Sequence, residues 1–272
     1  MCKRRPAVFL RTYSGEKLCT KCLETALEKG VFRSLARPRI LKPKSRLLVP
    51  VYLSLPSFSL AIARTITRIE KSFGSEVILA LPTSIKARIP QGLKLVEVDI
   101  NVDRLPSDAI SCLRLEKRWS LSIARSLGAD AVVIPLTRTL TNLIMLNALL
   151  AGRPEGVSEA EPWTISAEPP IISGLWAVES ELVAAYIALK DLYTDPVCRL
   201  DLSLAKKVFY SVAGRRPELE FSSAKSLSLL EKGLDSVMER CPLCAGYTLP
   251  GEKPCRYCSS TTLEVTARSL VW

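Results

Sequence analysis

The chain has 272 residues, 48% of them hydrophobic and 24% charged. This is the composition of a folded globular protein with one sizeable core, and it excludes a disordered polypeptide. The sequence contains no histidine, which excludes Ser-His-Asp and Cys-His catalysis and leaves thiolates and carboxylates as metal ligands. No apolar run is long enough to span a membrane, and no apolar segment follows basic residues 3–5, so we expect a cytosolic protein that does not bind membranes.

The net charge of +11 is concentrated at the N-terminal end. Residues 1–46 carry 13 Lys/Arg against 3 Glu, whereas residues 47–238 carry 21 basic and 21 acidic side chains. A neutral body with one basic end is typical of a protein that binds a polyanion, and a solvated tail without a partner is the alternative. Pro6, Pro38 and Pro43 prevent one long amphipathic helix here, which favours nucleic acid over a membrane surface. The expected RNA contacts are Arg37, Arg39, Lys42, Lys44 and Arg46.

The first cysteine cluster consists of Cys2, Cys19 and Cys22, and we expect residues 1–40 to form a basic cysteine module. Cys19 and Cys22 form a C-x2-C pair, but Arg5 stands where the partner of Cys2 would fall. A structural zinc site has four ligands, so three thiolates are one short. Either the site has degenerated, or a carboxylate or water completes it, or the given sequence begins a few residues late.

Residues 41–236 alternate between strand and helix patterns and predict one α/β domain. Short apolar runs bounded by Pro or Gly indicate buried strands, and apolar spacings of three or four residues indicate helices. This alternation predicts a parallel sheet covered on both faces, with ligands beyond the carboxyl ends of the strands. The expected strands are 47–52, 76–81, 93–99, 131–135 and 171–175, and the expected helices are 60–73, 107–127 (closed by Gly128), 140–150, 179–192, 202–213 and 223–238.

The loop after the first expected strand reads Ser54-Leu-Pro-Ser-Phe-Ser59. In a fold of this class, the loop at this position holds phosphate through its backbone N–H groups. Here it contains no glycine for close backbone approach and neither Lys nor Asp. We therefore expect that the protein does not bind ATP in the usual way.

Two cysteines and two tryptophans of the α/β domain stand outside these patterns. Cys112 lies in an expected helix, where a lone cysteine is typically a small buried hydrophobe. Trp163 and Trp176 are expected to be packing residues because no basic residues interleave with them along the sequence. Cys198 lies in an expected loop, and reactive thiolates at Cys112 and Cys198 would need an electropositive setting. The candidate cations for that setting are Arg114, Lys117, Arg118 and Arg199.

The second cysteine cluster lies at the C-terminal end, and we expect residues 237–272 to form a four-cysteine zinc module. Two C-x2-C pairs are separated by ten residues, a spacing typical of a structural zinc site. A disulfide framework is the alternative, and it suits a protein without an export signal poorly. Four thiolates leave no open coordination position, so a structural or RNA-positioning role is expected. The four ligands are Cys241, Cys244, Cys255 and Cys258.

Together these features resemble the tRNA 2-thiouridine enzymes of the PP-loop ATPase group over nearly the whole length. The resemblance rests on Cys19-Thr-Lys-Cys22 after Pro6-Ala7-Val8, on Val31-Phe32-Arg33-Ser34, on the α/β body and on the closing cysteine pairs. Active members of the group carry Ser-Gly-Gly-Lys-Asp-Ser after the first strand, and only the two outer serines remain in residues 54–59.

Other motifs of the active enzymes are also incomplete in this sequence. Their central C-x2-C pair corresponds to Cys112 and Leu115, so one thiol is missing. Their Gly-His-Asn segment corresponds to Pro135-Leu136-Thr137, and their third cysteine to Cys198. An intact frame with a lost ATP motif is similar to the cytoplasmic tRNA 2-thiolation protein 2 family, the non-catalytic partner of the thiolase.

This resemblance implies a Rossmann-like parallel sheet of the PP-loop ATPase (adenine nucleotide alpha hydrolase-like) type, flanked by N- and C-terminal cysteine zinc modules. It implies a pseudoenzyme that binds tRNA and forms a heterodimer with an active PP-loop thiolase, with zinc as its metal and with neither ATP nor an iron–sulfur cluster expected. Two alternatives stay open. One is a tRNA sulfurtransferase that uses Cys112 and Cys198 for a persulfide or part of a cluster, and the other is a zinc-ribbon nucleic-acid-binding protein unrelated to thiolation.

Overall fold

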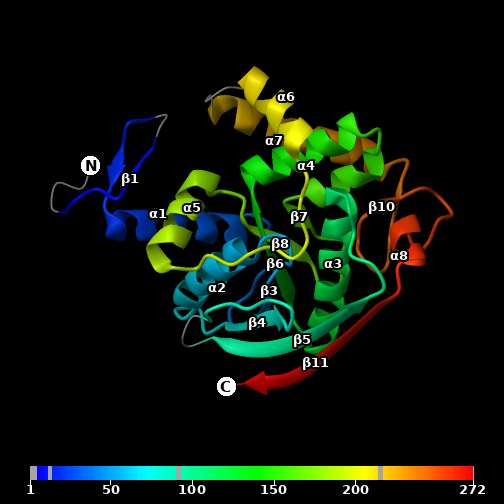
Figure 1. The fold of residues 1–272 in the computed structure, drawn as a ribbon, viewed down its shortest axis with the longest axis horizontal. Helices are drawn as coiled ribbons and strands as arrows, with labels where there is room; N and C mark the ends of the chain where they lie inside the picture. Colours follow the sequence, from blue (N-terminus) through cyan, green and yellow to red (C-terminus); the bar gives the residue numbers. More distant parts are fainter. Residues whose placement is uncertain (1–4, 12–13, 90–92, 214–216, 272) are drawn as a thin grey trace.

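The computed structural model describes residues 5–11, 14–89, 93–213 and 217–271 of the protein. Its centre is a seven-stranded sheet with helices on both faces (Figure 1), which confirms the expected α/β fold class. The five inner strands are parallel, and an antiparallel strand closes each edge. In spatial order the strands are β11 (Leu263–Val271), β5 (Lys94–Val102), β4 (Glu76–Pro82), β3 (Arg46–Pro50), β6 (Ala131–Thr137), β8 (Ile171–Leu175) and β7 (Trp163–Thr164).

The sheet is doubly wound around β3. Its apolar run, with Leu47, Leu48 and Val49 fully buried, lies at the centre of the sheet. The backbone moves outward from β3 to β4 and β5, and then crosses back to β6 and β8 on the other side. The strand order therefore reverses between β3 and β6, and ligands of such folds bind in the crevice at this point.

The helices form two layers. On one face, α1, α2 and α5 pack against one another, and on the other face α3 and α4 pack together with the 3-10 helix η1. Helices α6 and α7 pack outside α4. The helices are α1 (Thr20–Ala36), α2 (Pro56–Glu70), α3 (Ala109–Ser126), α4 (Arg138–Leu150), η1 (Pro154–Ala160), α5 (Ser180–Lys190), α6 (Ser203–Ala213), α7 (Pro217–Asp235) and α8 (Arg256–Ser260).

The N-terminal segment contains a helix that the sequence patterns did not predict. Helix α1 lies between the prolines at positions 6 and 38 and has 17 residues. These prolines exclude only a longer helix that would run through them. Leu23, Leu27 and Val31 of α1 are fully buried in the main core. Residues 20–36 are therefore part of the same packed body as the sheet.

The C-terminal end also joins the main sheet. Strand β11 leaves the four-cysteine segment and pairs with β5 along its whole length, at the lower edge of the molecule in Figure 1. Helix α7 begins at Pro217, six residues before the expected start, because proline is favoured at the first helical position. Gly128 adopts a φ of 60° after α3, as expected for a helix stop.

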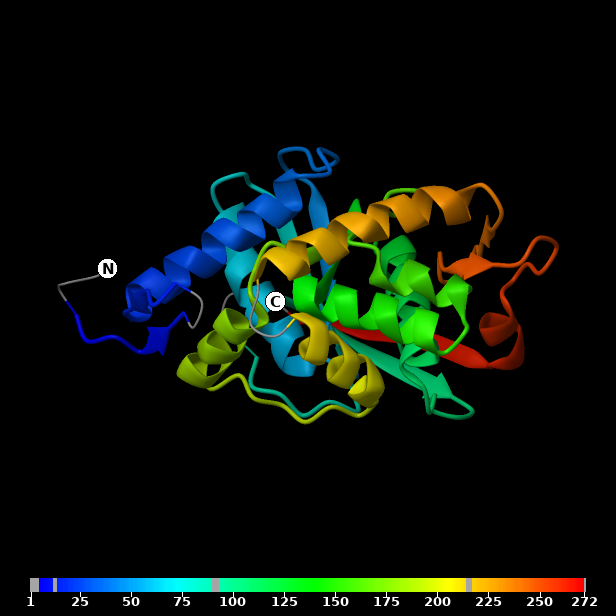
Figure 2. The same cartoon turned by 90° about the horizontal axis from the view of Figure 1, so that it is seen from above.

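Two small hairpins lie at opposite ends of the molecule (Figure 2). Strands β1 (Phe9–Leu10) and β2 (Lys17–Leu18) precede α1, and β9 (Glu239–Arg240) and β10 (Tyr247–Thr248) lie in the four-cysteine segment. Within the described residues, no helix combines the length and the apolar character needed to cross a membrane.

Candidate functional site

The loop between β3 and α2 occupies the position of a phosphate-binding loop, and its serines are turned inward. The exposed fractions of Ser54, Ser57 and Ser59 are 7%, 9% and 0%. The Ser59 hydroxyl accepts a hydrogen bond from the backbone N–H of Tyr52 (3.0 Å) and donates one to the carbonyl of Leu55 (3.1 Å). The last serine of the motif therefore closes the loop on itself.

A buried glutamate of α3 fills the anion position of this loop. Oε1 of Glu116 accepts a hydrogen bond from the backbone N–H of Ser54 at 2.9 Å, and Oε2 accepts one from Nε1 of Trp119, also at 2.9 Å. Glu116 is fully buried, and this burial raises its pKa to about 7 even though the bonds from Trp119 and Ser54 lower it. Backbone N–H groups before a helix attract anions, and here the protein supplies its own carboxyl group.

The segment between α5 and α6, residues 191–200, covers the same loop, and we call it the strap. Its backbone N–H groups at Val197 and Cys198 donate to the carbonyl of Leu53 at 2.7 and 3.2 Å. The hydroxyl of Ser57 accepts from the N–H of Thr194 at 2.9 Å and donates to the carbonyl of the same residue at 3.2 Å. The phosphate-loop position is therefore covered by protein on the side where the strand ends.

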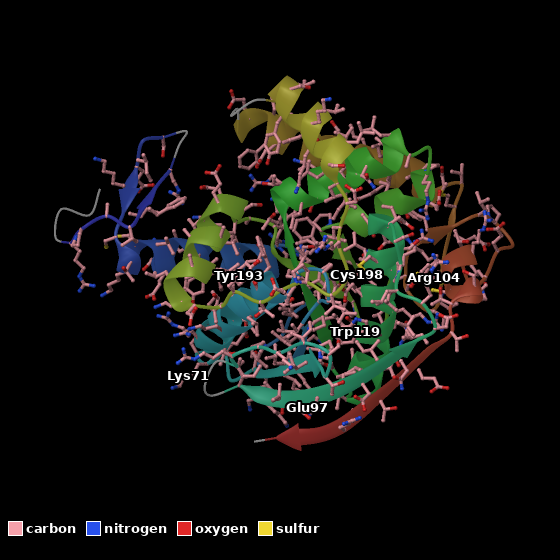
Figure 3. The ribbon with its side chains drawn as sticks, in the orientation of Figure 1. Lys71, Glu97, Arg104, Trp119, Tyr193 and Cys198 are labelled. Carbon is pink, nitrogen blue, oxygen red and sulfur yellow. A yellow bond between two sulfur atoms is a disulfide. The ribbon has the colours of Figure 1, made fainter. Side chains whose placement is uncertain are left out.

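The two isolated cysteines meet at this strap. Cys112 in the first turn of α3 and Cys198 in the strap form a disulfide with a Cα–Cα distance of 6.5 Å, and both are buried. Figure 3 labels Cys198 above Trp119 of α3. Leu115, at the position where the resemblance to the active enzymes predicts a second cysteine, is fully buried one turn further along. The sequence predicted neither this pairing nor the strap, because a contact across 86 residues leaves no local pattern.

Three of the four candidate cations for these thiols form contacts with other groups. Nε of Arg114 lies 3.2 Å from Oε1 of Glu159, and Nζ of Lys117 lies 3.0 Å from its Oε2. Arg118 donates to the carbonyls of Cys258 and Thr261. These side chains contact η1 and the four-cysteine segment, whereas Arg199 is exposed on the strap.

The four C-terminal cysteines are brought together as the spacing predicts. Their Sγ atoms all lie within 4.8 Å of one another and all four residues are buried. An ion bound at about 2.3 Å from each of four sulfurs sets those sulfurs roughly 3.8 Å apart, and the Sγ atoms of Cys244 and Cys255 are 3.8 Å apart. The donor set therefore fits one metal ion. We call residues 239–260, which contain these four cysteines, the four-cysteine module.

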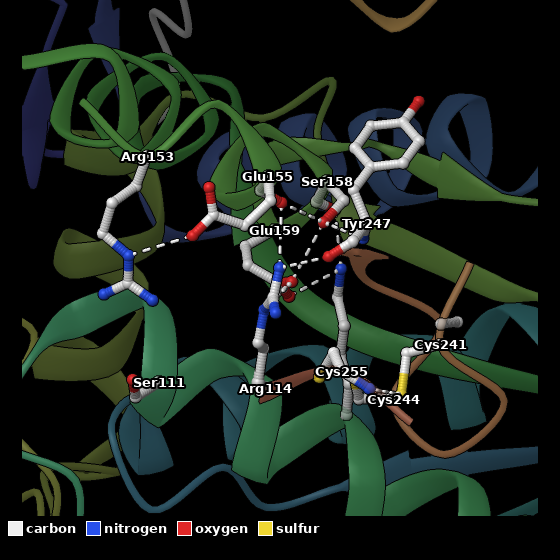
Figure 4. Close-up of polar contacts among 12 residues, drawn as sticks. Ser111, Arg114, Arg153, Glu155, Ser158, Glu159, Cys241, Cys244, Tyr247 and Cys255 are labelled. Atoms are coloured by element: carbon white, nitrogen blue, oxygen red, sulfur yellow. Dashed lines mark hydrogen bonds and ion pairs between the residues drawn. The ribbon is translucent and has the colours of Figure 1, made fainter. Parts of the chain in front are cut away.

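Helix α3 holds the four-cysteine module through arginine side chains. Arg114 donates to the carbonyls of Tyr247 (2.7 Å) and Glu155 (2.9 Å), and the N–H of Tyr247 donates to the hydroxyl of Ser158 at 2.9 Å (Figure 4). Burial lowers the pKa of Arg114, but the charges of Glu159, Cys244, Cys255 and Glu155 together raise it by more, so its guanidinium stays charged. A buried cation beside four thiolates compensates their negative charge.

The N-terminal cysteines are only partly described. Cys19 is the N-cap residue of α1 and is buried, and Cys22 lies half-buried in the first turn. Cys2, the third expected ligand, lies outside the described residues. A metal at this position stays a prediction.

The five expected RNA contacts are distributed over two regions. Arg37 follows α1 and faces a cleft between α1, α7 and the segment that joins β8 to α5. The others lie in residues 39–46, which lead to the amino end of β3, at the opposite edge from the phosphate loop. Of these, Arg46 forms an ion pair with Glu76 at 2.6 Å and donates a hydrogen bond to the carbonyl of Leu127 at 2.7 Å. Exposed residues Arg39 and Lys44 adopt positive φ.

Trp163 and Trp176, which the sequence predicts to be packing residues, lie beside basic side chains from distant parts of the sequence. Cζ of Arg37 lies 5.4 Å from the ring centroid of Trp163 and 4.8 Å from that of Trp176. Cζ of Arg138 lies 5.2 Å from the Trp176 centroid and 3.6 Å from that of Phe221. These pairs join segments far apart in the sequence, so inspection of neighbouring residues missed them.

Sequence reasoning also missed Glu116, although its position in the sequence carried a signal. It lies four residues after Cys112 and three before Trp119, so it shares the buried face of α3. A charged residue at the apolar spacing of a helix indicates a buried polar contact.

Comparison with known proteins supports the fold assignment. No protein-family model matches the sequence, and no curated protein matches it. Among solved structures, it is similar to the U34-tRNA thiolase NcsA from Methanococcus maripaludis, which was determined with its [4Fe-4S] cluster. The TM-score is 0.66 at 14% sequence identity, and the match covers 95% of this protein and 94% of the thiolase. The protein thus has the fold of a PP-loop tRNA thiolase over nearly its full length.

Proposed function

We propose that this protein is a non-catalytic subunit of a tRNA wobble-uridine 2-thiolation complex, of the cytoplasmic tRNA 2-thiolation protein 2 type. It binds tRNA and an active PP-loop thiolase as a heterodimer. The observation that carries the proposal is the closed phosphate loop within a thiolase fold. The fold is similar to that of a thiolase, but Glu116 and the strap cover the loop that stands at the phosphate-binding position of such folds.

The contacts of the loop explain why ATP binding would be disfavoured. A phosphate at the N–H of Ser54 would have to displace Oε1 of Glu116, and it would then face that carboxyl group in a buried site. The displaced carboxyl group would lose this hydrogen bond inside the protein, and its ionised form would also repel the phosphate. The loop offers neither a lysine nor a glycine backbone in compensation. Adenylation of the uridine and delivery of sulfur therefore belong to a partner that retains Ser-Gly-Gly-Lys-Asp-Ser.

Zinc is the metal proposed for the four-cysteine module. Four thiolates at the separation of a tetrahedral site match the ligand set of structural zinc. No coordination position is left open, so the ion would stabilise the module and leave the chemistry to the partner.

The proposal is tested by co-expressing the full-length protein with a candidate PP-loop thiolase from the same genome. We expect the two proteins to purify together, and we expect 2-thiouridine, quantified by mass spectrometry of tRNA nucleosides, only when both are present. Calorimetry with ATP should show binding to the thiolase and none to this protein alone. Micromolar ATP affinity of the isolated protein, or full thiolation by the partner alone, would refute the non-catalytic role.

A sulfurtransferase role is the second candidate, and the Cys112–Cys198 pair favours it. If Cys198 carried a persulfide, attack by the thiol of Cys112 on its inner sulfur would release hydrogen sulfide and leave the disulfide that is observed. A cellular thiol would then reduce the pair for the next cycle. This candidate requires both thiols, and that requirement separates it from the first.

A further inference from the structure

We propose that the cleft between α1, α7 and the β8–α5 segment is a single-stranded RNA site, in which α1 contacts phosphates and a stacked layer of arginine and aromatic side chains receives a base. This inference deepens the proposed function and rests on it for the identity of the RNA. The cleft has a volume of about 1160 Å³, which suits a short unpaired segment. Six basic and three acidic side chains line it.

One face of α1 supplies the basic wall. Lys21, Thr25, Lys29, Arg33 and Arg37 follow one another at intervals of four residues, and all line the cleft. Residues at this spacing form a single stripe along a helix. Like charges at this spacing destabilise a helix, so the stripe is not explained by helix stability.

The acidic residues of α1 point elsewhere and are neutralised there. Glu28 lies 3.0 Å from Arg68 of α2, and Glu24 forms ion pairs with Arg68 and with Lys190 of α5. Among the described residues, by contrast, no carboxylate lies within ion-pair distance of Lys29 or Arg33. The segregation of charge across α1 leaves the cleft face positive.

The acidic side chains of the cleft do not cancel this charge. Arg11 binds Glu16 at 2.5 Å and Glu179 at 3.3 Å, so both carboxylates are already paired. Glu220 is the third acidic side chain, so the six cations that line the cleft still outnumber the carboxylates by three. A polyanion is therefore the ligand that complements the cleft.

The end of the cleft is built for a planar group. Cζ of Arg138 lies over the rings of both Phe221 and Trp176, and Cζ of Arg37 lies over the ring of Trp176. Phe221 is 56% exposed, so its ring offers an open face. Nε1 of Trp176 is buried and has no hydrogen-bond partner among the described residues, which leaves a donor at the wall of the cleft. Bases stack on aromatic rings and arginine planes, whereas an acidic peptide uses only the charge.

Fluorescence anisotropy with fluorescein-labelled oligouridylate tests the charged wall, using the full-length protein. The double variant Lys29→Gln/Arg33→Gln should weaken binding and reduce the slope of log Kd against log salt by about 1.4, because single strands contribute about 0.7 per charge. Lys206→Gln/Lys207→Gln removes two exposed charges from α6, outside the cleft, and should leave the slope unchanged. Equal effects of the two pairs would overturn the assignment.

The stacked layer is tested separately in the same assay. Phe221→Leu should weaken binding roughly tenfold, within the range measured for base stacking, and Phe221→Tyr, which keeps the ring, should restore it. If polyglutamate competes as well as oligouridylate and Phe221→Leu has no effect, the cleft binds an acidic protein and the RNA assignment is wrong. Complex formation and 2-thiouridine production can still succeed in that case, so the failure would not be confused with failure of the proposed function.

Discussion

Glu116 carries the clearest residue-scale consequence of the closed loop. Burial raises its pKa from 4.5 to about 7, so the folded state holds this proton more tightly than the unfolded state. The resulting stabilisation is fully present below about pH 4.5 and is lost as the pH rises through 7. Glu116→Gln has no proton to lose, and its free energy of unfolding relative to wild type should therefore rise by roughly 3 kcal/mol between these limits.

Urea unfolding of both proteins between pH 5 and 8 measures this difference. The glutamine amide cannot accept from both Ser54 and Trp119, so a constant offset in favour of wild type is expected as well. Glu218→Gln, at an exposed position of α7, is the matched control and should show no such trend. A pH-independent difference for Glu116→Gln would mean that this carboxyl group keeps its ordinary pKa.

The loop itself shows how far sequence reasoning reached at this scale. The absence of glycine, lysine and aspartate from residues 54–59 predicted a loop unsuited to ATP. The group that fills the loop could not be predicted, because Glu116 is 62 residues from Ser54 and only the packing of α3 brings them together. The four C-terminal ligands were predictable because their geometry is set by two short local turns.

At the scale of elements, α3 connects the two regions of interest. Its first turn holds Cys112 beside the strap, its buried face carries Glu116, and Arg114 and Arg118 bind the four-cysteine module. The module has little core of its own: its cluster contains the four cysteines with only Leu243 and Tyr257 packed against them. We therefore expect the folding of the module to depend on a metal bound by the four cysteines.

We predict about one zinc per molecule, and loss of it in Cys241→Ser/Cys255→Ser. Because β11 follows the module and pairs with β5, loss of the metal should also increase amide hydrogen exchange along 263–271 and lower the thermal midpoint. Elemental analysis and exchange mass spectrometry measure the two effects. Cys112→Ser/Cys198→Ser removes two thiols elsewhere and should retain the zinc. Wild-type protein that carries iron in place of zinc, or no metal after mild purification, would contradict this assignment.

The elements that the sequence missed share a physical cause. The five inner strands were predicted because most of them are short, largely apolar runs typical of buried parallel strands, whereas β5 alternates apolar and polar residues. Helix α1 was hidden by its charges, since its basic residues were interpreted as part of a basic cysteine module over residues 1–40. Strand β11 alternates apolar and polar residues from Leu263 to Arg268, which is a usable signal. Its pairing with β5, however, depends on a contact across more than 160 residues.

At the scale of the whole molecule, the proposed RNA cleft and the four-cysteine module lie on different parts of one continuous body. α1 packs on β8 and α2, while the module is held by α3 and by η1 on the other face of the sheet. An RNA bound along α1 would approach the carboxyl ends of β6 and β8, where Arg138 and Trp176 lie. Ligands of folds of this class bind at this edge of the sheet. In this protein the phosphate-binding loop at the same edge is closed.

The role of the disulfide-bonded pair decides between the two functions at this scale. If the protein is a non-catalytic subunit, Cys112 and Cys198 only fix the strap, and Cys112→Ser/Cys198→Ser should retain most 2-thiouridine formation in the reconstituted heterodimer. Some loss of stability is expected because the cross-link closes a long loop of the unfolded polypeptide. If the pair transfers sulfur, each single variant should abolish thiolation while the complex still forms and still binds tRNA. Nucleoside mass spectrometry on the assembled complex separates these outcomes, with gel filtration and tRNA binding measured on the same samples. Only in the second outcome is 2-thiouridine lost while the complex and its tRNA binding persist.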